Sequence, residues 1–201
     1  TEMLSTYEAG ESLRDVVGPL GVPTEMAEGP CAVIGGGVGL AIAFPVAKHL
    51  VETGHEVHAI MGARTKDLLL MEDQFRELLD EDHIHITTDD GSYGEQGVVT
   101  APLERLLQDK AVSPVFCVGP VPMMKFSTLT AQKYDTPITA SLNPIMVDGT
   151  GMCGCCRVEV GGVTKFACVD GPDFDATLVD WDDLRARQAA YRSEEGASLK
   201  A

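Results

Sequence analysis

The feature that most limits what this chain can fold into is a short run rich in glycine and cysteine, Asp148-Gly-Thr-Gly-Met-Cys153-Gly-Cys-Cys156, with a further cysteine at Cys168. Plant-type two-iron clusters are bound by the spacing C-x4-C-x2-C and a distant fourth cysteine, whereas this chain has D-x4-C-x2-C-x11-C. Glycines let the backbone curl around a compact centre, and thiolates are soft donors that favour clustered iron. The spacing therefore predicts a 2Fe-2S cluster bound by these four side chains, and electron transfer as its use.

Two alternatives remain open at this motif. An aspartate that precedes a glycine is also typical of turns, so Asp148 could shape the loop without binding iron. Three cysteines and an aspartate can also hold zinc. In that case the chain would be a non-catalytic, zinc-stabilised nucleotide-binding or docking module, colourless when purified.

The length and charge of the chain limit which classes of protein it can belong to. A chain of 201 residues can form one full domain and a smaller one. Its formal net charge of -16 would repel nucleic acid and anionic lipid, and it is typical of a solvated acidic surface, a saline habitat or a basic partner. No apolar run is long enough to span a membrane, and the N-terminus has no signal-like pattern, so we expect a cytoplasmic protein. Clustering of Cys153, Cys155 and Cys156 favours a metal site over disulfides, and hence a reducing compartment.

The middle of the chain alternates apolar strands and amphipathic helices. We expect strands at 31–34, 56–61, 84–88, 114–118 and 137–141, and helices at 40–51, 68–79 with Asp67 as its N-cap, 99–108 and 121–133. Repeated strand-helix units predict an α/β fold with a parallel sheet covered on both faces. Such a sheet is typical of nucleotide-binding domains.

The two ends of the chain have a different character. Residues 1–29 contain too few strands for a sheet and should pack against something larger. Residues 144–201 contain a hairpin candidate that turns at Gly161-Gly162 and would bring Cys168 back beside Cys156. A helix should begin near Asp180, with Trp181, Leu184, Gln188 and Tyr191 on one face; we interpret it as a helix that faces the core, although it could also dock a partner.

Candidate ligand-binding residues lie where the strands should end, because nucleotides bind at the carboxyl edge of such sheets. The first strand is followed by a glycine turn that would let a pyrophosphate approach the start of a helix, although it lacks the G-x-G-x-x-G spacing. Arg64, after the second strand, could meet the adenine ribose or its phosphate, and Cys117 could touch a nicotinamide ring or pack as a small hydrophobe. The full set of cofactor-binding candidates is Gly35, Gly36, Gly37, Val38, Gly39, Gly62, Ala63, Arg64, Asp89, Asp90, Gly91, Ser92, Cys117, Gly119, Pro120 and Met123. The histidines show no metal-ligand spacing beside carboxylates, and we interpret them as surface or strand-packing residues; they are His49, His55, His58, His83 and His85.

Several of these segments together resemble the ferredoxin-NADP reductase superfamily. They are the glycine turn, Gly62-Ala-Arg-Thr-Lys-Asp67, Thr88-Asp-Asp-Gly-Ser-Tyr-Gly94, Val115-Phe-Cys-Val-Gly-Pro120 and Ser141-Leu-Asn-Pro-Ile-Met-Val-Asp-Gly-Thr-Gly-Met-Cys153. The nearest branch looks like the small (alpha) subunit of NADH-dependent reduced ferredoxin:NADP oxidoreductase, or sulfide dehydrogenase. A related branch, the dihydroorotate dehydrogenase electron transfer subunit, has cysteine as its first ligand. Asp148 therefore favours the former branch.

The resemblance implies a relay in which NADH or NADPH, FAD and a 2Fe-2S cluster exchange electrons, with no acid-base catalytic residue. It implies three parts: 1–29 as the remnant of an FAD-binding β-barrel and linker, 30–143 as the NAD(P)-binding domain, and 144–201 as the cluster-binding domain. Of the barrel, only a closing segment at 17–22 is expected here, so FAD binding would need a preceding segment or another chain. The implied partner is a larger flavin and iron-sulfur subunit resembling the glutamate synthase small chain, with ferredoxin as a further partner. Cys155 departs from the family pattern, and we interpret it as an exposed spare thiol.

Overall fold

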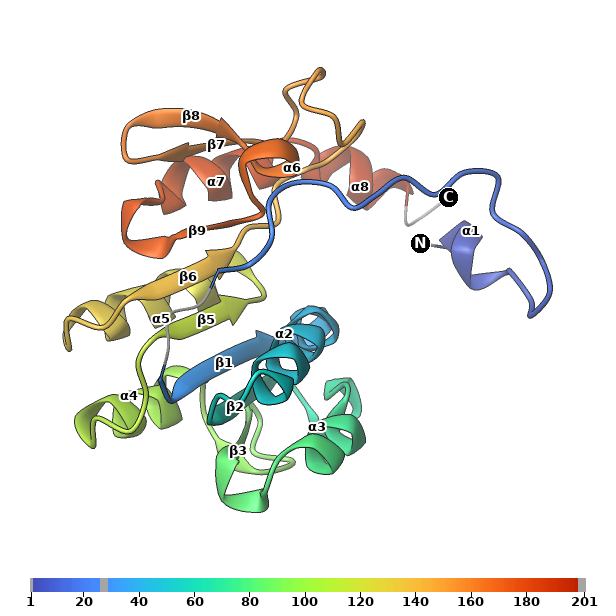
Figure 1. Cartoon of the computed structure of the whole chain (residues 1–201). Helices are drawn as coiled ribbons and strands as arrows, with labels where there is room; N and C mark the ends of the chain where they lie inside the picture. Colours follow the sequence, from blue (N-terminus) through green and yellow to red (C-terminus); the bar gives the residue numbers. More distant parts are fainter. Residues whose placement is uncertain (1, 26–28, 199–201) are drawn as a thin grey trace.

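A seven-stranded sheet forms the centre of the protein in the computed structural model, which describes residues 2–25 and 29–198. The strand order is β4-β3-β2-β1-β5-β6-β9, and every neighbouring pair is parallel except β6 and β9. The strands are β1 (Cys31–Gly36), β2 (Val57–Ala63), β3 (Ile84–Thr88), β4 (Glu95–Gln96), β5 (Val115–Val118), β6 (Ile138–Ser141) and β9 (Asp173–Asp175). The predicted α/β fold with a mostly parallel sheet is confirmed (Figure 1).

Helices cover both faces of this sheet (Figure 1). On one face, α2 (Leu40–Glu52) and α3 (Glu72–Leu78) bury Leu40, Ala43 and Phe75 against side chains of β1 and β2. On the other face, α4 (Thr100–Gln108) and α5 (Val121–Gln132) bury Leu103 and Met124 against the alternate side chains of the same strands. Burial on both faces explains the unbroken apolar runs of the central strands.

The helix expected at 68–79 with Asp67 as its N-cap was wrong at its start. Asp67 lies in a short 3-10 turn, η2 (Lys66–Leu68), and α3 begins only after Met71, which has a left-handed φ of 64°. Glu72 and Asp73 occupy the first turn of α3, where acidic side chains interact favourably with the helix dipole. The acidic pair therefore marks the start of this helix better than Asp67 does.

The C-terminal part adds a second, two-stranded sheet of β7 (Arg157–Val160) and β8 (Val163–Phe166). Gly161 and Gly162 form its turn with φ of 61° and 75°, as the hairpin prediction required. This part also contains α6 (Ala167–Asp170), η4 (Ala176–Leu178), α7 (Trp181–Gln188) and α8 (Arg192–Ser198). It is not packed separately, since Val158 and Trp181 share one hydrophobic cluster with the side chains of α4 and α5.

Helix α7 begins as predicted and then departs from the expected single stripe. Asp180 caps it by accepting hydrogen bonds from the backbone N–H of Asp182 and Asp183. Trp181 and Leu184 are buried in the core, which supports the core-facing interpretation. Tyr191, however, lies beyond the end of α7 and is 58% exposed, so it does not belong to the same buried face.

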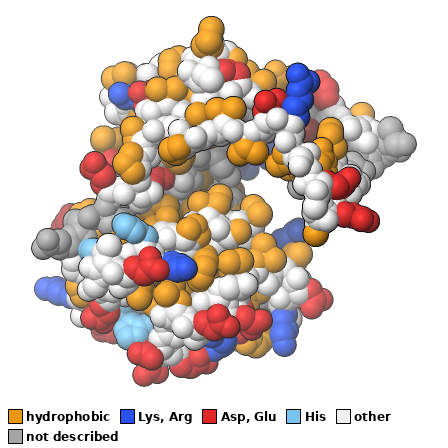
Figure 2. Space-filling view, turned by 45° about the vertical axis from the view of Figure 1, so that its right-hand side comes forward, with side chains coloured by type: hydrophobic (Ala, Val, Ile, Leu, Met, Phe, Trp, Pro, Cys, Tyr) orange, Lys and Arg blue, Asp and Glu red, His pale blue; other side chains and the backbone are white. Residues whose placement is uncertain are grey.

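The N-terminal segment, residues 2–25, runs along the outside of the molecule after a short helix α1 (Glu2–Ser5) (Figure 1). It touches the body near its end, where the Val22 N–H donates to Gly171 O at 2.7 Å and Thr24 Oγ1 donates to Asp173 at 2.5 Å. Val16 and Val17 are 82% and 72% exposed. Hydrophobic side chains are visible at the surface in Figure 2. The remainder of the expected 1–29 unit, residues 1 and 26–28, lies outside the described residues, as do residues 199–201.

Within residues 2–25 and 29–198, no helix is both long enough and apolar enough to cross a membrane.

Candidate nucleotide and iron-sulfur sites

The carboxyl ends of the parallel strands meet at one edge of the sheet. We call this edge the crest, meaning the turns 37–39, 64–66, 89–92 and 119–120, which follow β1, β2, β3 and β5. At its centre, η1 (Gly37–Gly39) leads directly into α2, so the first backbone N–H groups of that helix face the crest. Such a helix start favours anions because unpaired N–H groups and the helix dipole act together.

The turns after β1 and β5 approach each other closely. A Cβ atom added at Gly39 would lie 2.4 Å from Val118 O, and one added at Gly36 would lie 2.3 Å from Met123 Sδ. A Cβ at Gly119 would lie 3.1 Å from Gly36 N. The glycines therefore allow two backbone turns to pack against each other, which brings two of the predicted groups of site residues together.

The turns after β2 and β3 are joined by backbone hydrogen bonds. The Asp89 N–H donates to Ala63 O at 3.1 Å and the Asp90 N–H donates to Arg64 O at 3.3 Å. Ser92 caps the turn because its N–H and hydroxyl both donate to Asp90, and these bonds lower the pKa of the Asp90 carboxyl. The predicted site residues after β2 are thus held next to those after β3.

Two of the predicted residues lie beneath the crest. Gly62 is buried, and a Cβ added there would lie 2.4 Å from Val99 Cγ1, so this glycine makes room for packing against the start of α4. Cys117 has no exposed surface and belongs to the core cluster, where burial raises the pKa of its thiol strongly. Its environment is that of a small hydrophobe, the alternative that the sequence left open.

Replacing Glu72 by glutamine should lower the free energy of unfolding by about 1–2 kcal/mol at pH 7. Burial raises the pKa of this carboxyl, but hydrogen bonds from Tyr93 Oη at 2.6 Å and Arg76 Nε at 2.8 Å outweigh burial, and the pKa is lowered. Because the folded-state pKa is the lower one, the stabilisation is complete above about pH 4.3 and is lost as the pH falls through the folded-state pKa. Urea unfolding at several pH values should show the two proteins converging in acid. The exposed carboxylate of the same turn is the control: Asp73→Asn should change stability by less than about 0.5 kcal/mol.

The cysteine loop curls as the sequence predicts. Gly149, Gly151 and Gly154 have φ of 80°, 83° and 66°, a region that favours glycine. Asp148 accepts hydrogen bonds from the Thr150 N–H at 3.2 Å, from the Thr150 hydroxyl and from the Cys153 N–H at 3.1 Å. These bonds lower the pKa of the Asp148 carboxyl, so it stays an anion. Asp148 therefore shapes the turn, as the alternative reading of this motif expected, and it lies beside the first cysteine.

The sulfur atoms at the other side of the loop also converge. The hairpin places Cys156 Sγ 3.2 Å from Cys168 Sγ, where the two buried thiols share a hydrogen bond and form no disulfide. The Cys156 hydrogen bond, burial and the Asp148 charge all raise the pKa of the Cys168 thiol, whereas the Gly151 N–H lowers it. The four side chains thus form two neighbouring pairs, Asp148 with Cys153 and Cys156 with Cys168.

This arrangement suits a two-iron cluster better than a single zinc ion. Ligands of one tetrahedral zinc lie roughly 3.3–3.8 Å apart, as follows from its bond lengths. Among the described residues, no three of these four ligand atoms lie within 4.8 Å of one another. Two separate pairs of ligands are what two bridged metal ions require, and the thiolate donors fit iron.

Cys155 differs from the exposed spare thiol that the sequence suggested. Its side chain is only partly exposed, whereas Cys153 is exposed. A hydrogen bond with the Cys153 thiol is the main cause that raises the pKa of Cys155. The thiol therefore lies next to the predicted ligands.

A hydrogen-bonded link between the crest and the C-terminal part escaped the sequence analysis. Asn143 Nδ2 donates to Gly119 O at 3.3 Å, and Gln188 Nε2 donates to Asn143 O at 2.7 Å and to Asn143 Oδ1 at 3.0 Å. The link ties the β5 turn, the start of the cysteine loop and α7 together. The available signal was Gln188, a polar residue on the same predicted face as the buried Trp181 and Leu184.

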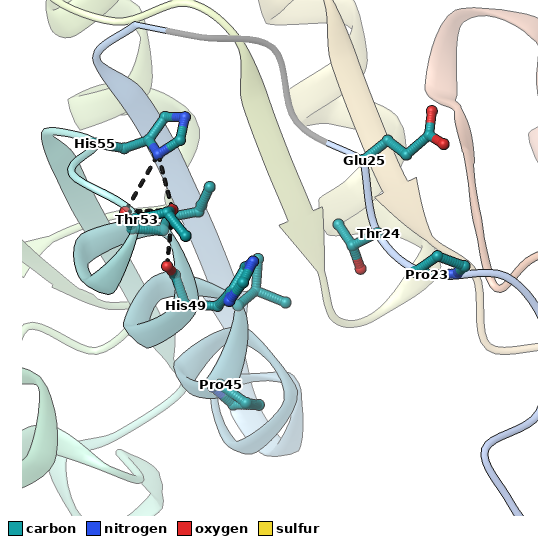
Figure 3. A pocket seen from close by; sticks show the side chains of 9 residues that line it. Pro23, Thr24, Glu25, Pro45, His49, Thr53 and His55 are labelled. Carbon is teal, nitrogen blue, oxygen red and sulfur yellow. Dashed lines mark hydrogen bonds between the residues drawn. The ribbon is translucent and has the colours of Figure 1, made fainter.

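Two hollows of the surface lie away from these sites. One of about 740 Å³ lies between the N-terminal segment and the C-terminal half of α2, lined by Pro23, Thr24, Glu25, Pro45, Val46, His49, Leu50, Thr53 and His55 (Figure 3). A second, of about 540 Å³, lies beside β6 and β9. The first is largely apolar, and neither hollow includes the crest or the cysteine loop.

Two protein families match this chain. Residues 33–128 match the oxidoreductase NAD-binding domain, and residues 143–180 match the iron-sulfur cluster binding domain of dihydroorotate dehydrogenase B. The first match contains the crest, and the second contains all four predicted cluster ligands. These matches bear out the predicted NAD-binding and iron-sulfur domains.

Similar proteins cover nearly the whole chain. A dihydroorotate dehydrogenase B (NAD(+)) electron transfer subunit homolog of Thermotoga maritima is 50% identical over 201 residues, which are 100% of this chain and 70% of that protein. The electron transfer subunit of Geobacillus kaustophilus is 33% identical over 183 residues, 88% of this chain and 68% of that protein. A solved structure of the NADH-dependent reduced ferredoxin-NADP oxidoreductase has a TM-score of 0.87 and 48% identity, covering 99% of this chain and 71% of that chain. This chain belongs to the family of dihydroorotate dehydrogenase B electron transfer subunits and their homologues, oxidoreductase components of the ferredoxin reductase type.

Proposed function

We propose that this chain passes electrons between a nicotinamide dinucleotide bound at the crest and a 2Fe-2S cluster bound by Asp148, Cys153, Cys156 and Cys168. The observation that carries the proposal is the pairing of the four ligand side chains, in particular the 3.2 Å between Cys156 Sγ and Cys168 Sγ. The identity to the NADH-dependent reduced ferredoxin-NADP oxidoreductase structure is 48%, and the identity to the Thermotoga electron transfer subunit homolog is 50%. Identity therefore does not separate the two branches, and Asp148 is the residue that favours the former one.

The crest supplies the nucleotide site. The N–H groups at the start of α2 would hold the pyrophosphate, and the close approach of Gly36, Gly39 and Gly119 leaves the backbone of two turns open to it. Arg64 is exposed beside these turns, where its cation could meet the adenine ribose or its phosphate. The other proposed contacts are Gly35, Gly37, Val38, Ala63, Asp89, Asp90, Gly91, Ser92, Pro120 and Met123, with Gly62 and Cys117 packed beneath them.

The cysteine loop supplies the electron site. When bound, a two-iron cluster accepts and releases single electrons, with a potential that its ligands, charge and hydrogen bonds set. The chain itself holds Asp148 as an anion and buries Cys156 and Cys168, which limits the access of water to one side of the centre. Asn143 and Gln188 position this loop relative to the β5 turn.

Asp148→Asn should weaken cluster binding, whereas Asp148→Cys should retain the cluster with a changed potential. Asparagine has one oxygen, which can still accept from the Thr150 N–H, but its amide nitrogen cannot accept from the Cys153 N–H, and the anionic ligand is lost. Cysteine supplies a softer anionic donor, so iron loss to a chelator should be slower than in the wild type. Chelator kinetics and a redox titration measure both effects. If the asparagine variant keeps iron like the wild type and the cysteine variant has an unchanged midpoint potential, Asp148 only shapes the turn.

The proposed relay also needs a flavin and a partner subunit. The relatives are named electron transfer subunits, which implies a partner subunit. We propose a larger flavin and iron-sulfur subunit of the glutamate synthase small-chain type as that partner, and ferredoxin as a further one. FAD would come from a segment that precedes the expected barrel remnant or from another chain; the exposed apolar residues of the N-terminal segment, such as Val16 and Val17, are suited to such a contact.

Anaerobic mixing of the cluster-containing protein with NADH tests the relay. We expect reduction of the cluster, seen as bleaching of its visible absorption, only when FAD and the segment or subunit that binds it are present. Bleaching at the same rate without flavin, or none with the complete complex, would contradict the proposed order of carriers.

A further inference from the structure

Glu56, His58 and His83 come together at the amino end of the sheet, opposite the crest. Glu56 precedes β2, His58 is its second residue, and His83 ends η3 (Glu81–His83) just before β3. Their ligand atoms all lie within 4.8 Å of one another, the one group of three or more metal-ligating side chains that does so in the described part of the chain. The sequence shows no metal spacing for these histidines, because His58 and His83 are 25 positions apart and only the fold brings them together.

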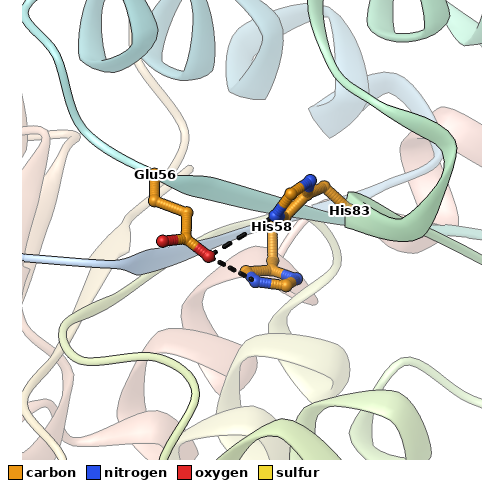
Figure 4. A group of neighbouring side chains, drawn as sticks. All are labelled: Glu56, His58 and His83. Atoms are coloured by element: carbon orange, nitrogen blue, oxygen red, sulfur yellow. Dashed lines mark hydrogen bonds and ion pairs between the residues drawn. The ribbon is translucent and has the colours of Figure 1, made fainter.

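The two imidazoles approach the same carboxylate oxygen (Figure 4). Glu56 Oε1 lies 3.7 Å from His58 Nε2 and 3.4 Å from His83 Nε2. Both distances are long for a hydrogen bond, which is typically about 2.7–3.2 Å. They are close to the roughly 3.3–3.5 Å that separate nitrogen and oxygen ligands around one tetrahedral zinc ion, as follows from its bond lengths. The space between Glu56 Oε1 and the two histidine nitrogens therefore suits a shared cation.

The remaining nitrogen of His58 has a partner as well. His58 Nδ1 lies 3.3 Å from His85 Nε2, on the neighbouring strand. Histidines that bind metals usually donate their second N–H to an acceptor, which fixes the tautomer and the ring orientation. Here a neutral His85 can accept from His58 Nδ1, leaving His58 Nε2 free to bind an ion.

We propose that Glu56 Oε1, His58 Nε2 and His83 Nε2 bind one zinc ion, which clamps the entry of β2 to the entry of β3. Imidazole with one carboxylate suits zinc, whereas magnesium and calcium prefer oxygen ligands alone. Glu56 is 56% exposed at its side chain, so water can occupy the fourth position. Because the site lies at the end of the sheet remote from the crest, its role is structural and independent of the electron relay. The net charge of -16 also attracts cations to the surface.

Calorimetric titration of the cluster-containing protein with zinc chloride under anaerobic conditions tests this site. We expect one saturable site, at least about tenfold weaker in Glu56→Gln and in His83→Ala. His49→Ala, which removes an exposed histidine of α2, should bind as the wild type does. Glu56→Gln keeps the size of the side chain, so it reports on the ligand even if the alanine variant is unstable.

Zinc bound by thiolates has to be separated from zinc bound by histidines. The same titration with the cluster-containing Cys155→Ser variant, which removes the partly exposed thiol that the proposed cluster does not use, should leave this site unchanged. Absence of saturable binding, equal affinity in Glu56→Gln and the wild type, or loss of the site in Cys155→Ser would each overturn the proposal. The readout is metal binding, so failure of the electron relay would leave its result unaffected.

Discussion

Cys156→Ser should abolish cluster binding, and Cys155→Ser should leave it intact. The two cysteines are neighbours in sequence, but Cys156 is buried with its sulfur 3.2 Å from Cys168, whereas Cys155 contacts Cys153 and is partly exposed. The serine hydroxyl is neutral at pH 7, so unlike a thiolate or the Asp148 carboxylate it supplies no anionic donor to iron. We expect iron content and visible absorption close to zero in the first variant and wild-type values in the second.

Folding has to be checked in both serine variants. The Cys156 side chain packs against Ala167 and Cys168 in a small hydrophobic group, so Cys156→Ser should also destabilise the hairpin somewhat. Circular dichroism should show that both variants keep the helices and strands, because the main core is formed by other residues. A folded Cys156→Ser protein that still contains the cluster would contradict the assignment of Cys156 as a ligand. A Cys155→Ser protein that loses the cluster would contradict the assignment of Cys155 as a thiol that the cluster does not use.

Gly39→Ala should weaken nicotinamide dinucleotide binding by about tenfold or more and lower the free energy of unfolding by about 1–3 kcal/mol. Gly39 has an ordinary helical φ of -59°, so the effect arises from contact alone. Its added Cβ would lie 2.4 Å from Val118 O and 3.0 Å from Gly119 Cα, both backbone atoms that cannot rotate away. The turns after β1 and β5 would have to separate, which changes the proposed pyrophosphate site. Titration with NADH and urea unfolding measure the two effects.

Gly54→Ala is the matched control for this substitution. Gly54 lies just beyond the other end of α2 with φ of 90°, and an added Cβ would have nothing within 4 Å. The variant should lose about 1 kcal/mol of stability from backbone strain, yet bind NADH as the wild type does. If Gly39→Ala binds NADH with unchanged affinity, the first turn does not hold the pyrophosphate.

The central fold could be predicted from the sequence because its signals are local. Each buried parallel strand is a short apolar run, and each covering helix has an apolar face, so the alternation between residues 31 and 141 was readable. The edge strands β4 and β9 were missed. They contain only two and three residues and are mostly polar, so neither length nor alternation marks them. β9 also joins the sheet from the C-terminal part, a long-range pairing that no local pattern indicates.

The sites were predictable to different degrees. The cysteine loop has a fixed ligand spacing and glycines where the backbone has positive φ, so its geometry follows from its own residues. The contacts of Asn143 with Gly119 and Gln188 depend on how the C-terminal part packs against the crest. The approach of His58 to His83 depends on the register of β2 and β3. Such contacts arise from tertiary structure, so no characteristic residue spacing in the sequence indicates them.

The metal content of the protein purified without oxygen tests the central claim most directly. We predict a brown protein with about two iron and two acid-labile sulfide per chain, and an electron paramagnetic resonance signal after reduction. A colourless protein with one zinc at the cysteine loop, lost in Cys156→Ser but kept in Glu56→Gln, would contradict the electron-transfer function and leave a zinc-stabilised nucleotide-binding module.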